Sequence, residues 1–203
     1  MNRGLFKIWQ ILILLDSIQN SMEIKYKFTM EDERIFTACR DEPPEILDIN
    51  GLFDISQNTF HMNESGVTIS GNATVIWDIQ PSDRVQLAFG ILYFDRGTWQ
   101  PTTLNLMFKD FCKVLFDKNQ LWYDSYPKHI INSPEIKEKC FRVKGAKMIL
   151  ETYSVDFIFS SGFPLKDGRY AFRFRFTAFD KEEMKRPSEG CFEIKGDFNK
   201  LHN

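Results

Sequence analysis

The segment from Arg169 to Phe179 reads RYAFRFRFTAF, and it constrains the fold more than any other part of the chain. Tyr170, Phe172, Phe174 and Phe176 recur at every second position, with arginines among the residues between them. Because successive side chains of a strand point to opposite faces of a sheet, this pattern predicts a strand with one apolar face and one solvent-exposed face. The Asp-Gly pair just before it is a turn signal, as expected between antiparallel strands.

Other β-branched and aromatic runs predict further strands over residues 67–71, 73–77, 84–94, 153–159 and 189–197. One segment differs, because Leu104, Phe108, Phe111, Cys112 and Leu115 recur at three and four residues. That spacing predicts an amphipathic helix over 104–116. We therefore expect a mainly β fold, an antiparallel β cup or immunoglobulin-like sandwich with one short helix.

The N-terminal segment is expected to lie outside this fold. Residues 1–21 combine a basic start, a short apolar run from Ile8 to Leu15 and small residues at Ser17 and Ser21, the order of a signal peptide. A buried N-terminal helix is the alternative. With the signal removed and no second long apolar stretch, residues 22–203 are expected to form one secreted, extracellular domain that does not span a membrane. Two glycosylation sequons, at Asn63 and Asn72, agree with secretion.

The net charge argues against a nucleic-acid partner, and the cysteines indicate disulfides and not a metal site. The chain has 26 Lys and Arg against 28 Asp and Glu, so it lacks the basic excess expected of a nucleic-acid binder. Its four cysteines predict two disulfides in an oxidising compartment, and three pairings are open. No clustered Cys/His spacing predicts a zinc site, and we expect neither a metal nor a cofactor.

No catalytic motif is present, and we expect a non-enzymatic protein. The histidines are only His61, His129 and His202. A secreted hydrolase, the least favoured alternative, would need a buried nucleophile beside His61 or His129.

The chain has 20 phenylalanines, more large apolar rings than a core of this size needs. A cup whose sheets splay apart would use the surplus to line an internal cavity for a hydrophobic small molecule or lipid. The candidate lining residues are Phe89, Ile91, Trp99, Phe157, Phe159, Phe163, Phe172, Phe174 and Phe176. In the competing hypothesis, the chain is a β-sandwich interaction module with a solid core and no small ligand.

Several short motifs occur in an order that resembles a known family. After Cys39 come Asp110–Leu115, Cys140–Gly145, Gly168–Tyr170 and Gly190–Lys195. This order resembles the lipid-recognition (ML-like) superfamily that includes the ganglioside activator, and within it the insect CheA/CheB chemosensory proteins. The similarity spans roughly residues 37–198. This chain departs from the ganglioside activator in having fewer cysteines.

The resemblance implies an extracellular β cup that encloses a lipid or pheromone-like ligand. It also implies a role in chemosensation, with a sensory receptor or channel as a partner. By position in the motifs, it implies pairing of Cys39 with Cys191 and of Cys112 with Cys140.

Overall fold

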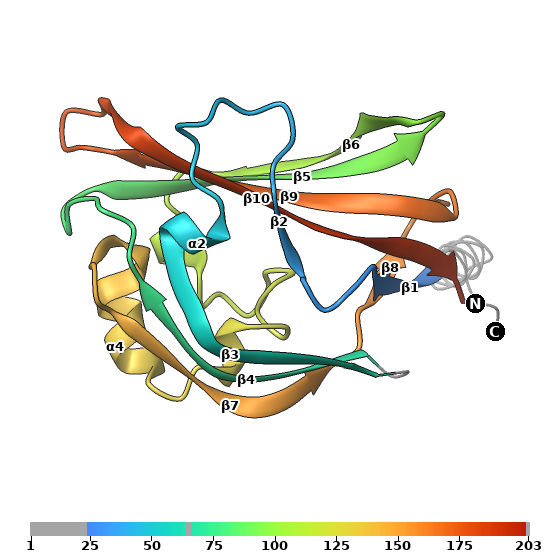
Figure 1. Cartoon of the computed structure of the whole chain (residues 1–203), viewed down its shortest axis with the longest axis horizontal. Helices are drawn as coiled ribbons and strands as arrows, with labels where there is room; N and C mark the ends of the chain where they lie inside the picture. The colour runs from blue at the N-terminus through green and yellow to red at the C-terminus, as the bar shows by residue number, and fades with distance from the viewer. Residues whose placement is uncertain (1–23, 64–65, 202–203) are drawn as a thin grey trace, which may run out of the picture.

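The computed structural model describes residues 24–63 and 66–201. The predicted signal peptide, residues 1–21, lies outside the described residues, as does His202. Two antiparallel sheets face each other and form a curled half-barrel cup (Figure 1). This architecture confirms the expected mainly β cup.

The large sheet has the strand order β6-β5-β9-β10-β1-β8, and β2 pairs with β10 off this path. Its strands are β1 (Ile24–Met30), β2 (Phe36–Ala38), β5 (Arg84–Asp95), β6 (Thr98–Phe108), β8 (Ile158–Ser161), β9 (Gly168–Phe179) and β10 (Lys185–Lys200). The small sheet has the order β3-β4-β7. Its strands are β3 (Phe53–Asn63), β4 (Gly66–Val75) and β7 (Lys147–Val155).

The helix predicted over 104–116 is wrong. Residues 104–108 belong to β6, which pairs with β5 and places Leu106 opposite Phe89. Leu104 and Phe108 are four residues apart, a spacing that puts two side chains on one face of a strand as well as of a helix. Only a single turn, α3 (Phe111–Val114), is helical there.

The structure instead has three short α-helices among the described residues, together with two 3-10 turns. Besides α3 they are α2 (Ile49–Leu52) and α4 (Ser133–Lys139), and the 3-10 turns are η1 (Pro127–His129) and η2 (Cys140–Arg142). The segment from Pro127 to Cys140 therefore contains η1 and the whole of α4. Pro134 lies in the first turn of α4, where proline costs no hydrogen bond.

Two strand predictions also need correction. The runs 67–71 and 73–75 form one strand, β4, and residues 76–77 follow its end. Gly71 continues this strand instead of forming a turn, beside a register shift whose extra residue lies in β7. Its φ is +100°, and a Cβ there would lie 1.9 Å from the Gln57 carbonyl oxygen. The run 153–159 is split, because the chain leaves the small sheet after Val155 and enters the large sheet at Ile158. This crossing joins the two layers beside the cup's interior.

Both disulfides of the described chain match the pairing that the resemblance implies. The long-range disulfide joins Cys39 to Cys191, with 152 residues of sequence separation. The short-range disulfide joins Cys112 to Cys140, with a separation of 28 residues. The long-range disulfide links the residue after β2 to β10, and the short-range disulfide links α3 to η2.

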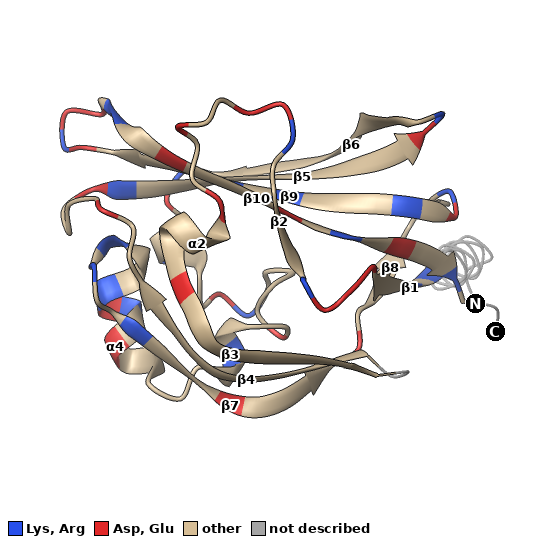
Figure 2. Ribbon diagram, in the orientation of Figure 1, with Lys and Arg blue, Asp and Glu red and all other residues tan. Residues whose placement is uncertain are grey.

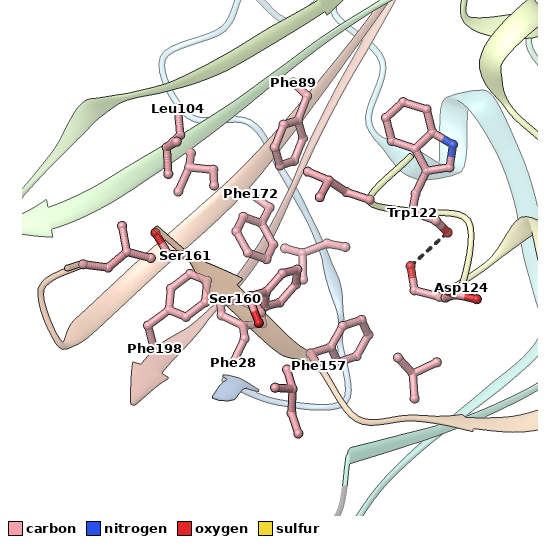
Figure 3. Close-up of a pocket in the computed structure, with 18 of the residues that line it drawn as sticks. Phe28, Phe89, Leu104, Trp122, Asp124, Phe157, Ser160, Ser161, Phe172 and Phe198 are labelled. Atoms are coloured by element: carbon pink, nitrogen blue, oxygen red, sulfur yellow. Dashed lines mark hydrogen bonds between the residues drawn. The ribbon is translucent and has the colours of Figure 1, made fainter. Parts of the chain in front are cut away.

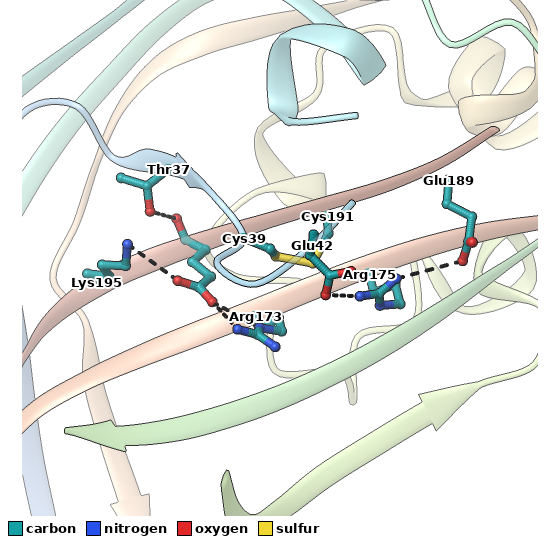
Figure 4. The surroundings of a disulfide bond; sticks show 9 residues. Thr37, Cys39, Glu42, Arg173, Arg175, Glu189, Cys191 and Lys195 are labelled. Atoms are coloured by element: carbon teal, nitrogen blue, oxygen red, sulfur yellow. Dashed lines mark hydrogen bonds and ion pairs between the residues drawn. A yellow bond between two sulfur atoms is a disulfide. The ribbon is translucent and has the colours of Figure 1, made fainter. Parts of the chain in front are cut away.

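The outer face of the large sheet carries the arginines that alternate with the rings of β9. Arg173 donates to Glu193 at 2.9 and 2.6 Å, and Lys195 lies 3.3 Å from the same carboxylate. Arg175 donates to Glu42 and lies 3.8 Å from Glu189 (Figure 4). The predicted solvent-exposed face of β9 is therefore a layer of ion pairs, partly covered by the segment that follows Cys39. Elsewhere, charged residues of both signs are interspersed along the described ribbon (Figure 2).

Candidate functional site

A cavity of about 740 Å³ lies against the inner face of the large sheet (Figure 3). Ligand pockets in proteins have volumes of about 300–1,000 Å³, so this cavity is large enough for a ligand. At about 30 Å³ for each water-sized group, a volume of about 740 Å³ has room for roughly 25 non-hydrogen atoms.

The large sheet supplies one wall from five adjacent strands. Phe89 and Ile91 come from β5, and Phe172 and Phe174 from β9, with Phe89 lying opposite Phe174 in the strand register. Together with these four, the wall residues of the sheet are Phe28, Met30, Leu104, Leu106, Ile194 and Phe198. The alternation along each strand explains why these side chains share the inner face.

Aromatic rings in this wall pack on one another. The Phe172 ring lies 4.5 Å from Phe28 and 5.7 Å from both Phe159 and Phe198, measured between centroids. These distances are typical of favourable edge-to-face and offset contacts. The rings therefore form a wall with fixed neighbours around the empty space.

The rest of the lining comes from two segments outside those five strands. One runs from Leu121 to His129, and the other from Ser154 through β8 to Leu165. Tyr26 holds the end of the second segment, because its hydroxyl donates to the Leu165 carbonyl at 3.2 Å and accepts from the Leu165 N–H at 2.8 Å.

Four apolar side chains of the lining are 46–63% exposed to solvent: Leu106, Leu121, Ile158 and Phe163. Their exposure marks the rim of the cavity. Phe163 lies in the segment that connects β8 to β9.

Of the nine predicted lining residues, seven line the cavity: Phe89, Ile91, Phe157, Phe159, Phe163, Phe172 and Phe174. Trp99 does not. Its ring packs on Phe94, and the guanidinium groups of Arg40 and Arg169 lie 4.9 and 5.7 Å from its centroid. Arg169 is on the face opposite the β9 rings, so Trp99 lies outside the cup.

Phe176 is the second exception. It has the same strand face as Phe172 and Phe174 but is packed in the closed core, 5.4 Å from Phe111 and 6.0 Å from Phe141. The interior is thus hollow beside Phe172 and solid beside Phe176.

Sequence reasoning missed several lining residues for identifiable reasons. Leu104 and Leu106 were assigned to a helix, and no strand was predicted over Phe28 and Met30. The alternation of Tyr26, Phe28 and Met30, whose side chains are buried, was an available signal for β1. Trp122 lies in an irregular segment, and no sequence period indicates that it faces the cavity.

The charged groups of the lining are paired with one another or with close neighbours. Lys128 donates to Asp124 at 3.1 Å, and Asp156 lies 3.6 Å from Lys27. His129 has both ring nitrogens in hydrogen bonds, at 2.6 Å from Glu151 Oε1 and 3.0 Å from the Asp124 carbonyl oxygen. The polar groups therefore form a local network at one side of a mainly apolar cavity.

The hydrolase hypothesis requires a nucleophile beside a histidine. The His129 ring stacks on Tyr153 at 3.7 Å, and its two nitrogens contact a carboxylate and a carbonyl. Burial raises the pKa of Tyr153 above its usual range, which keeps its phenol neutral. His61 is exposed and lies 3.7 Å from Glu33. In the described part of the chain, no serine or threonine hydroxyl bonds to either imidazole.

Both predicted glycosylation sites lie on the small sheet. Asn63 ends β3, and Asn72 lies within β4, where its amide donates to Gln57 Oε1 at 3.3 Å. No helix among residues 24–63 and 66–201 has the length and apolarity needed to cross a bilayer. Within the same residues, no group of three or more His, Cys, Asp or Glu side chains could hold a metal ion.

No protein-family model matches this sequence, and no curated protein shows significant similarity to it.

Proposed function

We propose that this chain is a secreted, non-enzymatic binding protein for an elongated hydrophobic ligand, of the lipid or pheromone-like class. The observation that supports this most directly is the aromatic-lined cavity of about 740 Å³ between the inner face of the large sheet and the segments 121–129 and 154–165. A solid-core interaction module would have no such internal space. The order of the cysteine motifs, which resembles the insect chemosensory branch of the ML-like superfamily, supports a role in chemosensation with a receptor or channel as partner.

The physical basis of binding is removal of apolar surface from water. Each buried methylene contributes about 0.8 kcal/mol, so a 12-carbon chain contributes on the order of 9 kcal/mol before association costs. A preformed cavity lowers those costs, because its walls need little reorganisation. Such binding requires shape and apolar walls and no catalytic group.

The test is ligand extraction combined with direct binding. Mass spectrometry of an organic extract of insect-expressed protein should find a co-purified hydrophobic compound, and a fluorescent fatty probe should bind with micromolar or lower Kd. Ile91→Trp places an indole in the cavity and should weaken probe binding at least tenfold. Trp99→Ile, a change on the outer face of the neighbouring strand, should leave it unchanged.

The hypothesis of a hydrophobic binding protein is wrong if no lipid co-purifies and the wild-type chain binds no probe. Equal effects of Ile91→Trp and Trp99→Ile would place the binding site elsewhere.

A further inference from the structure

The inner face of β9 passes from cavity wall to solid core within two residues. Phe172 and Phe174 line the cavity, whereas Phe176, next on the same face, does not. Phe176 is only 4% exposed and is enclosed by the rings of Phe111 and Phe141. The cavity therefore ends along this strand between positions 174 and 176.

The Phe174 ring forms that boundary. It stacks on Phe192 with centroids 5.1 Å apart and an interplanar angle of 19°, and it lies 5.1 Å from Phe89. Phe192 is buried, does not line the cavity and is backed by Phe36 at 5.4 Å. Phe174 itself is only partly buried although its neighbours are apolar, as expected for a ring with one face toward the cavity.

Trp122 completes the same end of the cavity. Its ring packs 4.8 Å from Phe108 and 5.4 Å from Phe111, a residue of the solid core. Its Nε1 donates to the Leu115 carbonyl at 3.1 Å, which fixes the indole in place. Of the two residues, Phe174 can be shortened without removing a hydrogen bond.

We propose that Phe174 is the end wall that determines the longest apolar chain the cavity accepts. The inference rests on the proposed function, because it assumes an elongated apolar ligand. Once an apolar ligand chain is long enough to reach Phe174, further methylenes do not increase its affinity, because they must stay in water or force the ligand to bend. Below that length, each added methylene raises affinity about fourfold.

Phe174→Ala removes six ring carbons, which leaves room for roughly four more carbons of ligand, since the surrounding rings relax only in part. Phe176→Ala is the matched control, because it makes the same chemical change on the same face of the same strand, but behind the wall. Phe174→Leu is a milder change that keeps an apolar side chain.

The experiment measures competition between a bound fluorescent fatty probe and unbranched primary alcohols of increasing length, on the mature full chain. For the wild type, we expect affinity to rise with length and then reach a limit. For Phe174→Ala, we expect the limit to move to chains longer by about four carbons, and for Phe174→Leu to move less in the same direction. Phe176→Ala should lower the thermal midpoint and leave the limit unchanged.

The outcomes separate the two proposals. A wild-type chain that binds neither probe nor alcohols overturns the proposed function itself. A wild-type chain that binds, with the same length limit in both Phe174 variants, overturns the end-wall assignment alone. So does a control variant at Phe176 that shifts the limit as far as Phe174→Ala does.

Discussion

The buried carboxylate of Glu193 offers a sharp test of how the large sheet is held together. Its side chain is 1% exposed and receives two hydrogen bonds from Arg173, at 2.9 and 2.6 Å, with the Lys195 ammonium at 3.3 Å. Glu193→Gln keeps the shape but removes the negative charge. Both cations then lose their counter-charge in a poorly hydrated layer.

Breaking a buried ion pair costs about 3–5 kcal/mol. Arg173 is 29% exposed, so water compensates part of the loss, and we expect about 3 kcal/mol. With a urea m-value of about 2 kcal/mol/M, the unfolding midpoint should fall by about 1.5 M. Tryptophan fluorescence in urea, with the disulfides intact, measures this shift.

The control is Glu135→Gln on α4, where Glu135 and Lys139 are an exposed pair spaced by four residues. We expect no measurable change in its midpoint, because such pairs add little to stability. If Glu193→Gln shifts the midpoint no more than Glu135→Gln does, the outer ionic layer does not stabilise the sheet and the reasoning fails. Replacing Arg173 by Met in the Glu193→Gln background should recover part of the loss, since one unpaired cation is removed.

Three further predictions follow from the same structure. Removing the long-range disulfide by two Cys→Ser changes should lower the free energy of unfolding by about 5 kcal/mol, because the disulfide closes a loop of 152 residues. Removing the short-range disulfide, which closes a loop of 28 residues, should lower it by about 3.6 kcal/mol. Equal losses in the guanidinium unfolding midpoint would contradict this order. Burial opposes ionisation of Asp83, but hydrogen bonds from Arg186 and the Gln80 N–H outweigh it and lower the pKa of Asp83. The ionised Asp83 carboxylate therefore stabilises the fold fully above about pH 4, and this stabilisation is lost as the pH falls through the folded-state pKa of Asp83. We expect Asp83→Asn to be less stable than the wild type at pH 7 and to lose less stability than the wild type on acidification to pH 3. Trp122 lines the cavity, so ligand should change its fluorescence, and Trp122→Phe should abolish most of that change; an undiminished signal would place the ligand elsewhere.

Local alternation in the sequence was sufficient to predict three strands of the large sheet: β5, β9 and the central part of β10. The strands predicted over 84–94 and 169–179 match β5 and β9 to within one residue at each end. In runs of this length, apolar side chains at every second position fit a strand and do not fit a helix. The segment 104–116 failed for the opposite reason: its spacing of four satisfies both periods, and pairing with β5 decided for the strand.

The sequence alone determined which side chains share a face; the tertiary structure decided what each face meets. Phe172, Phe174 and Phe176 form one alternating row, yet two of them border empty space and the third is buried against Phe111 and Phe141. Alternation is a property of one strand's backbone, whereas a cavity depends on how far a second layer, distant in sequence, stands from it. Trp99 shows the same limit, because only the pairing of β6 with β5 and the position of Arg169 place its ring on the outer face.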